Sequence, residues 1–201
     1  MFFVSETIEH LTHEFEIIPP GRKQILKGIS DFIDSHKVAN IIFICTHNSR
    51  RSHIARVWAQ MAASYFNISN VYAYSGGTEA TAFNPRAVGA LRKIGFRIEE
   101  KVGGSNPRYN VRYSDQHPGF EVFSKKYSDL ENPQENFAAI MTCTHADENC
   151  PVVTGASTRI SLPYDDPKDF DGTSLETIKY EERSLEIGRE ILYAFSQIKR
   201  Q

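Results

Sequence analysis

The amino-acid sequence predicts an α/β protein, a three-layer sandwich in which helices cover both faces of a four-stranded parallel sheet. Short β-branched apolar runs alternate with stretches of helical periodicity, the pattern of strand–helix–strand units. The chain has 201 residues, of which 40% are hydrophobic. This length suffices for one well-buried domain and is short for two. No internal repeat or low-complexity tract interrupts the alternation.

The first part of the chain is expected to be helical. Residues 1–39 contain a clear amphipathic pattern from Gly21 to Lys37. We expect residues 1–39 to form a helical extension packed on the core, and residues 40–201 to form the domain. The first strand is expected from Asn40 to Cys45, and apolar residues recur at helical spacing from Ile54 to Tyr65.

The other strands and helices follow in alternation. Strands are expected at Val71–Ser75, Phe137–Thr142 and Arg159–Leu162. Asn84-Pro85 opens a helix that Gly95 closes, and the last helix begins near Thr173, with Glu176 completing a capping box. Residues 101–135 are an irregular insert, in which alternating apolar residues predict a hairpin around Asp115–Gly119.

The loop after the first strand carries the main candidate site. Cys45 is followed by five residues, an arginine and a serine, between a buried strand and a helix. Backbone N–H groups of such a loop bind a tetrahedral anion, and an arginine adds a planar fork of donors. A cysteine at its base is a candidate nucleophile. The expected oxyanion-binding residues are Thr46, His47, Asn48, Ser49, Arg50, Arg51 and Ser52.

Two further groups of reactive residues are expected in the same cleft. They follow the third and fourth strands, and ligands of parallel sheets lie beyond the carboxyl ends of the strands. Cys143 and Cys150 lie about 10 Å apart if a continuous helix joins them, so their pairing requires that segment to unwind. Two unrelated core cysteines remain an alternative. A zinc site of Cys143, His145 and Cys150 has no evident fourth ligand, and we expect neither a metal nor a cofactor.

The third group is Asp165-Asp166-Pro167, directly after the last strand. A carboxyl group above an anion bound to a thiolate can protonate a leaving oxygen. A surface turn rich in Asp and Pro is the alternative.

Composition excludes several function classes. The formal net charge is −2 and no basic tract is present, which argues against nucleic-acid binding. No apolar segment approaches the ~20 residues of a membrane span, and the first residues do not resemble a signal peptide. Three cysteines, an odd number, do not suggest a disulfide framework. We therefore expect a cytoplasmic enzyme.

These motifs together resemble the low-molecular-weight protein tyrosine phosphatase superfamily, and most closely its thioredoxin-coupled arsenate reductases. The resemblance covers roughly residues 40–199. Cys45 to Ser52 resembles the shared anion loop, and Asp166-Pro167 matches the general-acid motif. Cys143 and Cys150 fall on the positions of the redox pair that distinguishes the reductases from the phosphatases.

The resemblance implies a relay of thiols with arsenate as substrate. Cys45 attacks the arsenate held by Arg51, and Asp166 protonates the leaving oxygen. Cys143 then attacks the adduct and Cys150 attacks Cys143, which leaves a disulfide for thioredoxin to reduce.

Several features depart from the family pattern. The extension before residue 40 and the long insert are additional, and His47 replaces a small loop residue. Arg56 lies where some reductases have an acidic residue that helps bind potassium, so we expect no such site. Two other functions remain open. A phosphatase acting on phosphotyrosine or small phosphate esters needs only Cys45, Arg51 and Asp166, and a non-catalytic oxyanion sensor or redox switch needs no general acid.

Overall fold

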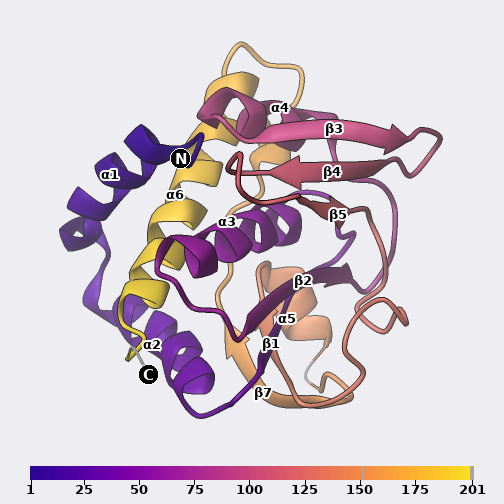
Figure 1. Ribbon diagram of the computed structural model, residues 1–201. Coiled ribbons are helices and arrows are strands. Elements are labelled where there is room, and N and C mark those ends of the chain that lie inside the picture. The colour runs from indigo at the N-terminus through magenta and orange to yellow at the C-terminus, as the bar shows by residue number, and fades with distance from the viewer. Residues whose placement is uncertain (151, 200–201) are drawn as a thin grey trace.

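The computed structural model describes residues 1–150 and 152–199 of the chain. Its main sheet contains four parallel strands in the order β2-β1-β6-β7 (Figure 1). Their bounds are Ala39–Cys45 for β1, Val71–Gly77 for β2, Phe137–Met141 for β6 and Ala156–Ser161 for β7. These strands correspond to the four that the sequence predicts, and the three-layer α/β class is confirmed.

Strand β1 lies between β2 and β6, and successive side chains enter opposite cores. Ile41 and Phe43 belong to the larger hydrophobic cluster, whereas Ile42 and Ile44 belong to the smaller one. This is the period-two alternation of a strand. Because both faces are buried, the strand appears in the sequence as an uninterrupted apolar run.

Helices cover the two faces unequally. On one face α3 (Arg51–Tyr65) packs on β1 and β2, α2 (Pro20–Asp34) packs on β7, and both contact the long α6 (Glu176–Ser196). On the other face the short α5 (Thr144–Asn149) packs on β1 and β6. The remaining helices are α1 (Ser5–His13), η1 (Phe15–Ile17), α4 (Pro85–Ile94) and η2 (Pro167–Phe170).

The N-terminal helices pack along α6 (Figure 1). Ile8 and Leu11 of α1 are fully buried in the same hydrophobic cluster as the helices over the main sheet. Two ion pairs join the region to α6, from Arg22 to Glu190 at 2.8 Å and from Arg189 to Glu14 at 2.6 Å. The extension therefore shares one core with the domain.

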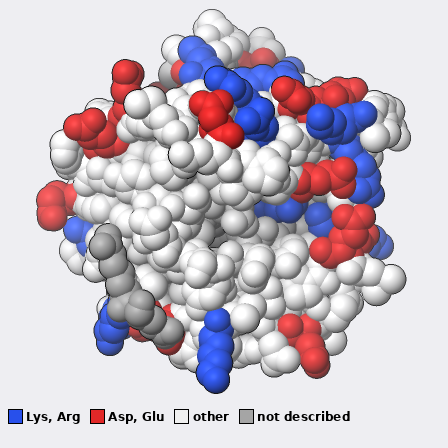
Figure 2. Space-filling view, viewed as in Figure 1, with Lys and Arg blue, Asp and Glu red and all other residues white. Residues whose placement is uncertain are grey.

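The insert and the residues just before it form a second sheet, of antiparallel strands in the order β3-β4-β5. The expected hairpin joins β4 (Arg108–Arg112) to β5 (Phe120–Val122), and its loop includes the expected turn. Strand β3 (Arg97–Val102) was not expected from the sequence, because it is an edge strand with one buried side chain. Figure 2 shows positive and negative side chains interleaved over this region rather than one extended patch of a single sign.

The last helix begins at Glu176, later than the expected start near Thr173. The Thr173 hydroxyl accepts the N–H of Leu175, while the Glu176 carboxylate accepts the N–H of Gly172. These bonds form a tight turn before the helix instead of the expected capping box, which accounts for the later start.

Among the described residues, no helix is both long enough and apolar enough to cross a membrane.

Candidate active site

The strand order brings the three groups of reactive residues to one edge of the main sheet. β1 ends at Cys45, its neighbour β6 is followed by Cys143, and β7, next to β6, is followed by the segment of Asp166. The carboxyl ends of parallel strands lie at the same edge, so segments far apart in sequence become adjacent.

The Cys45 thiol is buried, and a chain of polar groups continues from it. Its Sγ lies 3.1 Å from the Ser52 hydroxyl, which accepts a hydrogen bond of 2.9 Å from Asn48 Nδ2. Asn48 Oδ1 in turn accepts the backbone N–H of Lys125. The insert therefore fixes the orientation of the amide that positions Ser52 beside the thiol.

The loop backbone is held tightly against its neighbours. Asn48 adopts a φ of 43°, the left-handed region, which Asn tolerates better than most residues. A Cβ on Gly77 would lie 2.6 Å from the Thr46 carbonyl oxygen and 2.7 Å from the Asn48 nitrogen. The Ser49 carbonyl accepts the N–H of Asn84. Glycine at the end of β2 is therefore required for the close approach of that strand to the loop.

Arg51, the first residue of α3, joins the loop to the general-acid candidate. Its Nη2 donates to Asp166 Oδ2 at 2.6 Å, and its Nη1 donates to the Tyr164 carbonyl at 2.8 Å. Its Nε is buried and has no hydrogen-bond partner among the described residues. An entering oxyanion can satisfy this donor, and the Asp166 carboxylate is already within reach of the same guanidinium.

Two side chains of the expected oxyanion loop point elsewhere. Arg50 Nε donates to the Tyr180 hydroxyl at 2.9 Å, and its guanidinium lies 3.9 Å from both Asp166 and Asp171. Burial raises the pKa of Tyr180 to about 12, so its hydroxyl stays protonated and donates to Asp171. The His47 side chain is half-exposed and lies 3.7 Å from Glu79.

The two remaining cysteines lie at opposite ends of α5. Cys143 precedes the helix, and its Sγ accepts the N–H of Ala146 at 3.4 Å. Cys150 follows the helix and is half-buried. All three cysteines are free thiols. Thr46 connects the groups, because its hydroxyl lies 3.5 Å from Cys143 Sγ and 3.2 Å from His145 Nδ1.

The zinc alternative finds no support in this geometry. Within residues 1–150 and 152–199, no group of three or more His, Cys, Asp or Glu side chains is arranged to hold a metal ion.

A buried basic cluster behind the loop was missed by the sequence analysis. It consists of His53, Arg56 and Lys125, which are at most 9% exposed. Desolvation lowers the pKa of Lys125 to about 8 and that of Arg56 to about 10, and it lowers the pKa of His53 well below its usual range. Their spacing in the sequence gives no signal, because residues of the insert cover them.

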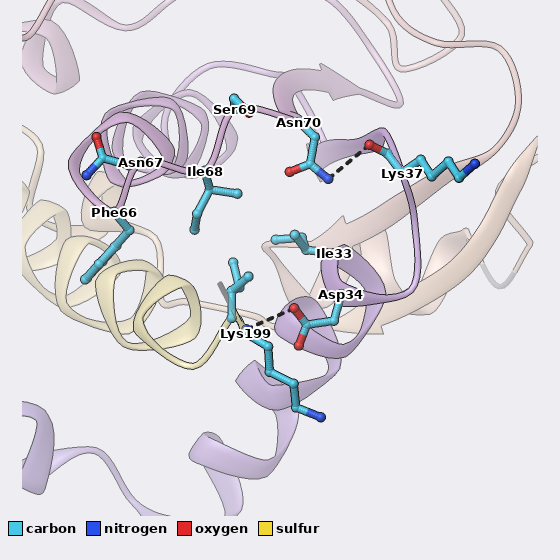
Figure 3. Close-up of a pocket in the computed structure, with 10 residues that line it drawn as sticks. Ile33, Asp34, Lys37, Phe66, Asn67, Ile68, Ser69, Asn70 and Lys199 are labelled. Atoms are coloured by element: carbon cyan, nitrogen blue, oxygen red, sulfur yellow. Dashed lines mark hydrogen bonds between the residues drawn. The ribbon is translucent and has the colours of Figure 1, made fainter. Parts of the chain in front are cut away.

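One surface hollow lies away from this site, beyond the amino ends of strands β1 and β2. Figure 3 shows Asp34, Lys37, Asn70 and Lys199 around it. The Asn70 amide donates to the Lys37 carbonyl, and Asp34 accepts the Lys199 N–H. These two bonds join segments of the chain that are far apart in the sequence.

Comparison with known proteins agrees with the geometry. No family model matches the chain. The arsenate reductase of Halalkalibacterium halodurans is 30% identical over 136 residues, which cover 68% of this chain and 79% of that protein. The arsenate reductase of Bacillus licheniformis is also 30% identical, over 156 residues that cover 75% of this chain and 91% of that protein.

Solved structures show the same fold. The low-molecular-weight protein tyrosine phosphatase of T. tengcongensis superposes with a TM-score of 0.52 at 18% identity, over 80% of this chain and 99% of that one. A low-molecular-weight phosphotyrosine phosphatase of Vibrio cholerae O395 gives a TM-score of 0.52 at 12% identity, over 77% and 93% of the two chains. These structures show that the chain has the fold of the low-molecular-weight protein tyrosine phosphatases. The sequence matches show that it belongs to the family of the arsenate reductases.

Proposed function

We propose that this protein reduces arsenate to arsenite through a relay of Cys45, Cys143 and Cys150. The observation that carries the proposal is the contact of Cys143 with the oxyanion loop. Its Sγ lies 3.5 Å from the hydroxyl of Thr46, the residue that follows Cys45. A hydrolase that uses Cys45 alone has no need of a second thiol at this place.

The first step is attack of the Cys45 thiolate on arsenate. The S–As bond forms and one As–O bond breaks, and Asp166 gives its proton to the departing oxygen, which leaves as water. Arg51 and the loop amides hold the remaining oxygens. The unpartnered Nε of Arg51 supports its role as an oxyanion donor. The 2.6 Å bond from Arg51 places the Asp166 carboxyl group beside the oxyanion loop, where a departing oxygen would lie.

The second step reduces arsenic by two electrons. The Cys143 thiolate attacks Cys45 Sγ, an S–S bond forms, and the electron pair of the S–As bond stays on arsenic as arsenite leaves. The two sulfur atoms are together oxidised by two electrons. Cys150 then attacks Cys143, which frees Cys45 as a thiolate and leaves a Cys143–Cys150 disulfide.

The final step needs a dithiol reductant, for which we propose thioredoxin. The half-buried position of Cys150 at the end of α5 supports this role, because thiol–disulfide exchange requires access to the sulfur atom under attack. Reduction returns both thiols and oxidises the partner.

The test is arsenate-dependent NADPH consumption in the presence of thioredoxin and thioredoxin reductase. Wild-type protein turns over, Cys45→Ser is inactive, and Cys150→Ala stops after one arsenite per molecule. Hydrolysis of an aryl phosphate is measured beside it, and Cys150→Ala should leave that activity unchanged.

The second candidate is a phosphatase acting on phosphotyrosine or small phosphate esters. It is favoured by the Cys45, Arg51 and Asp166 arrangement, which is sufficient for a cysteinyl-phosphate mechanism. Aryl phosphate hydrolysis without any arsenate turnover would establish this function and exclude the relay.

A further inference from the structure

Thr46 lies between a thiol and an imidazole. Its hydroxyl is 3.5 Å from Cys143 Sγ on one side and 3.2 Å from His145 Nδ1 on the other. A hydroxyl both donates and accepts, so it can take a proton from the thiol while giving its own to the ring. The three side chains therefore form a continuous path from Cys143 to an exposed histidine.

Few titratable side chains lie on the described elements that pack against α5. α5 packs on β1, which contributes the Cys45 thiol, and on β6, which has no titratable side chain. On α5 itself, Asp147 is paired with Arg159 of β7 at 2.6 Å, and Glu148 is exposed. Cys143 and Cys150 complete the set of titratable groups at the ends of the helix.

We propose that His145 is a positioning residue for the second step of the reaction, and that it receives the proton of Cys143 through the Thr46 hydroxyl. The inference rests on the proposed function, because only a reductase needs a Cys143 thiolate. It assigns a role to a side chain that the oxyanion chemistry itself does not use.

The proton balance is complete within these groups. The Cys143 thiol gives its proton to Thr46 Oγ1 while Thr46 gives its proton to His145 Nδ1, and the ring becomes an imidazolium. The Cys143 thiolate then forms the S–S bond with Cys45 as arsenite leaves. The exposed ring returns its proton to water, so the path is reset before the next turnover.

The experiment is single-turnover arsenite release from fully reduced protein mixed with arsenate, without reductant. His145→Gln should lower the rate about 10- to 100-fold at pH 7. This is at or below the lower limit of about 100-fold for general base catalysis, because the ring acts through a hydroxyl. Glu148→Gln, on the same helix, is the matched control and should keep the wild-type rate. Hydrolysis of an aryl phosphate should stay within about 2-fold in both variants.

A structural role of His145 would not change the shape of the pH profile. The wild-type rate should reach a plateau as the pH rises, because a neutral imidazole can accept the proton. The rate of His145→Gln should continue to rise over the same range, because the thiol then loses its proton directly to solvent. Thr46→Val should behave like His145→Gln, Thr46→Ser should restore the rate, and Thr46→Val combined with His145→Gln should be no slower than either alone.

Two results would overturn the inference in distinguishable ways. If wild-type protein releases arsenite and His145→Gln has the same rate and pH profile, His145 has no part in the step while the reductase function stands. If wild-type protein releases no arsenite, the proposed function fails and this inference fails with it.

Discussion

Arg159 of β7 holds α5 in its helical form, and its removal should accelerate the last intramolecular step of the relay. Its Nε donates to the Cys150 carbonyl at 3.1 Å and its Nη2 donates to the Asp147 carbonyl. Nη2 also lies 2.6 Å from Asp147 Oδ1. The angle at this contact does not allow a hydrogen bond, so the contact contributes only the attraction of opposite charges. One side chain thus fixes the last part of α5.

The proposed Cys143–Cys150 disulfide cannot form while α5 is intact. Seven residues at about 1.5 Å each separate the two Cα atoms by about 10 Å along the helix axis. A disulfide needs Cα atoms within about 7 Å. The rate of Cys150 attack is therefore limited by the fraction of molecules in which α5 is open.

The size of the effect follows from the contacts that are lost. Each hydrogen bond from the half-buried guanidinium contributes about 1 kcal/mol. The ion pair, with side chains 27% and 22% exposed, contributes about 0.5 kcal/mol. Water replaces part of these contacts in Arg159→Ala, so the substitution should lower the free energy needed to open α5 by roughly 2 kcal/mol. That change increases the open population about 30-fold.

Hydrogen exchange of the Asp147 and Cys150 amides, which donate to the carbonyls of Cys143 and Ala146, measures this population directly. Arg159→Ala should exchange about 30-fold faster there, and should form the Cys143–Cys150 disulfide faster by a similar factor when oxidised with diamide. Arg159→Lys is the matched control, because it keeps the charge but has no planar fork to reach two carbonyls, and it should have an intermediate effect. Unchanged exchange in α5, with β6 protected as in wild type, would refute the reasoning.

Three other substitutions, one of them with a matched control, test the site and its surroundings. Asp166→Ala should lower kcat about 100-fold in either chemistry without weakening phosphate binding measured by calorimetry, because it removes an acid that also occupies Arg51. Gly77→Ala should abolish activity and lower the urea midpoint of unfolding, because its Cβ would lie 2.3–2.7 Å from backbone atoms. Gly89→Ala on α4 is the control: its Cβ meets nothing within 4 Å, and the variant should stabilise the folded protein by about 0.5 kcal/mol. The pKa of Lys125 is about 8 in the folded protein against 10.5 in the unfolded chain, so between these pH values the unfolded chain binds more protons and the wild-type protein gains stability as the pH rises. Lys125→Met removes the buried charge and should raise the free energy of unfolding in urea at pH 7 by up to roughly 3 kcal/mol. The variant should also show a smaller gain of stability between pH 8 and 10.5.

The sequence predicted strands best where both faces of the strand are buried. The two central strands of the main sheet, β1 and β6, contain continuous apolar runs because both of their faces are buried. β3 escaped prediction for the opposite reason. In Arg97–Val102 only Ile98 is buried, and the strand exists because it pairs with β4, whose position depends on the whole insert. Charged residues on both faces are typical of an exposed edge strand.

The candidate site was predictable in its parts but not in its contacts. The order of the strands in the sheet is enough to place Cys45 and Cys143 near each other, because they lie at the ends of the neighbouring strands β1 and β6. It does not imply that Thr46 lies between Cys143 and His145, because that depends on the side-chain rotamers and on where α5 begins. Asp166 was expected near the anion, and its bond to Arg51 is a property of the folded loop.

The buried basic cluster shows most clearly what a local pattern omits. Arg56 and Lys125 are 69 positions apart, and each would be expected at the surface from its type alone. Aromatic rings of the insert cover both charges, with the Arg56 guanidinium 5.3 Å from the Phe120 ring centre and Lys125 Nζ 4.4 Å from that of Phe123. The backbone of Lys125 also holds Asn48 and, through it, Ser52 beside the nucleophile. The insert therefore does more than extend the fold, because the segment that buries two cations is the one that orients the hydroxyl next to Cys45.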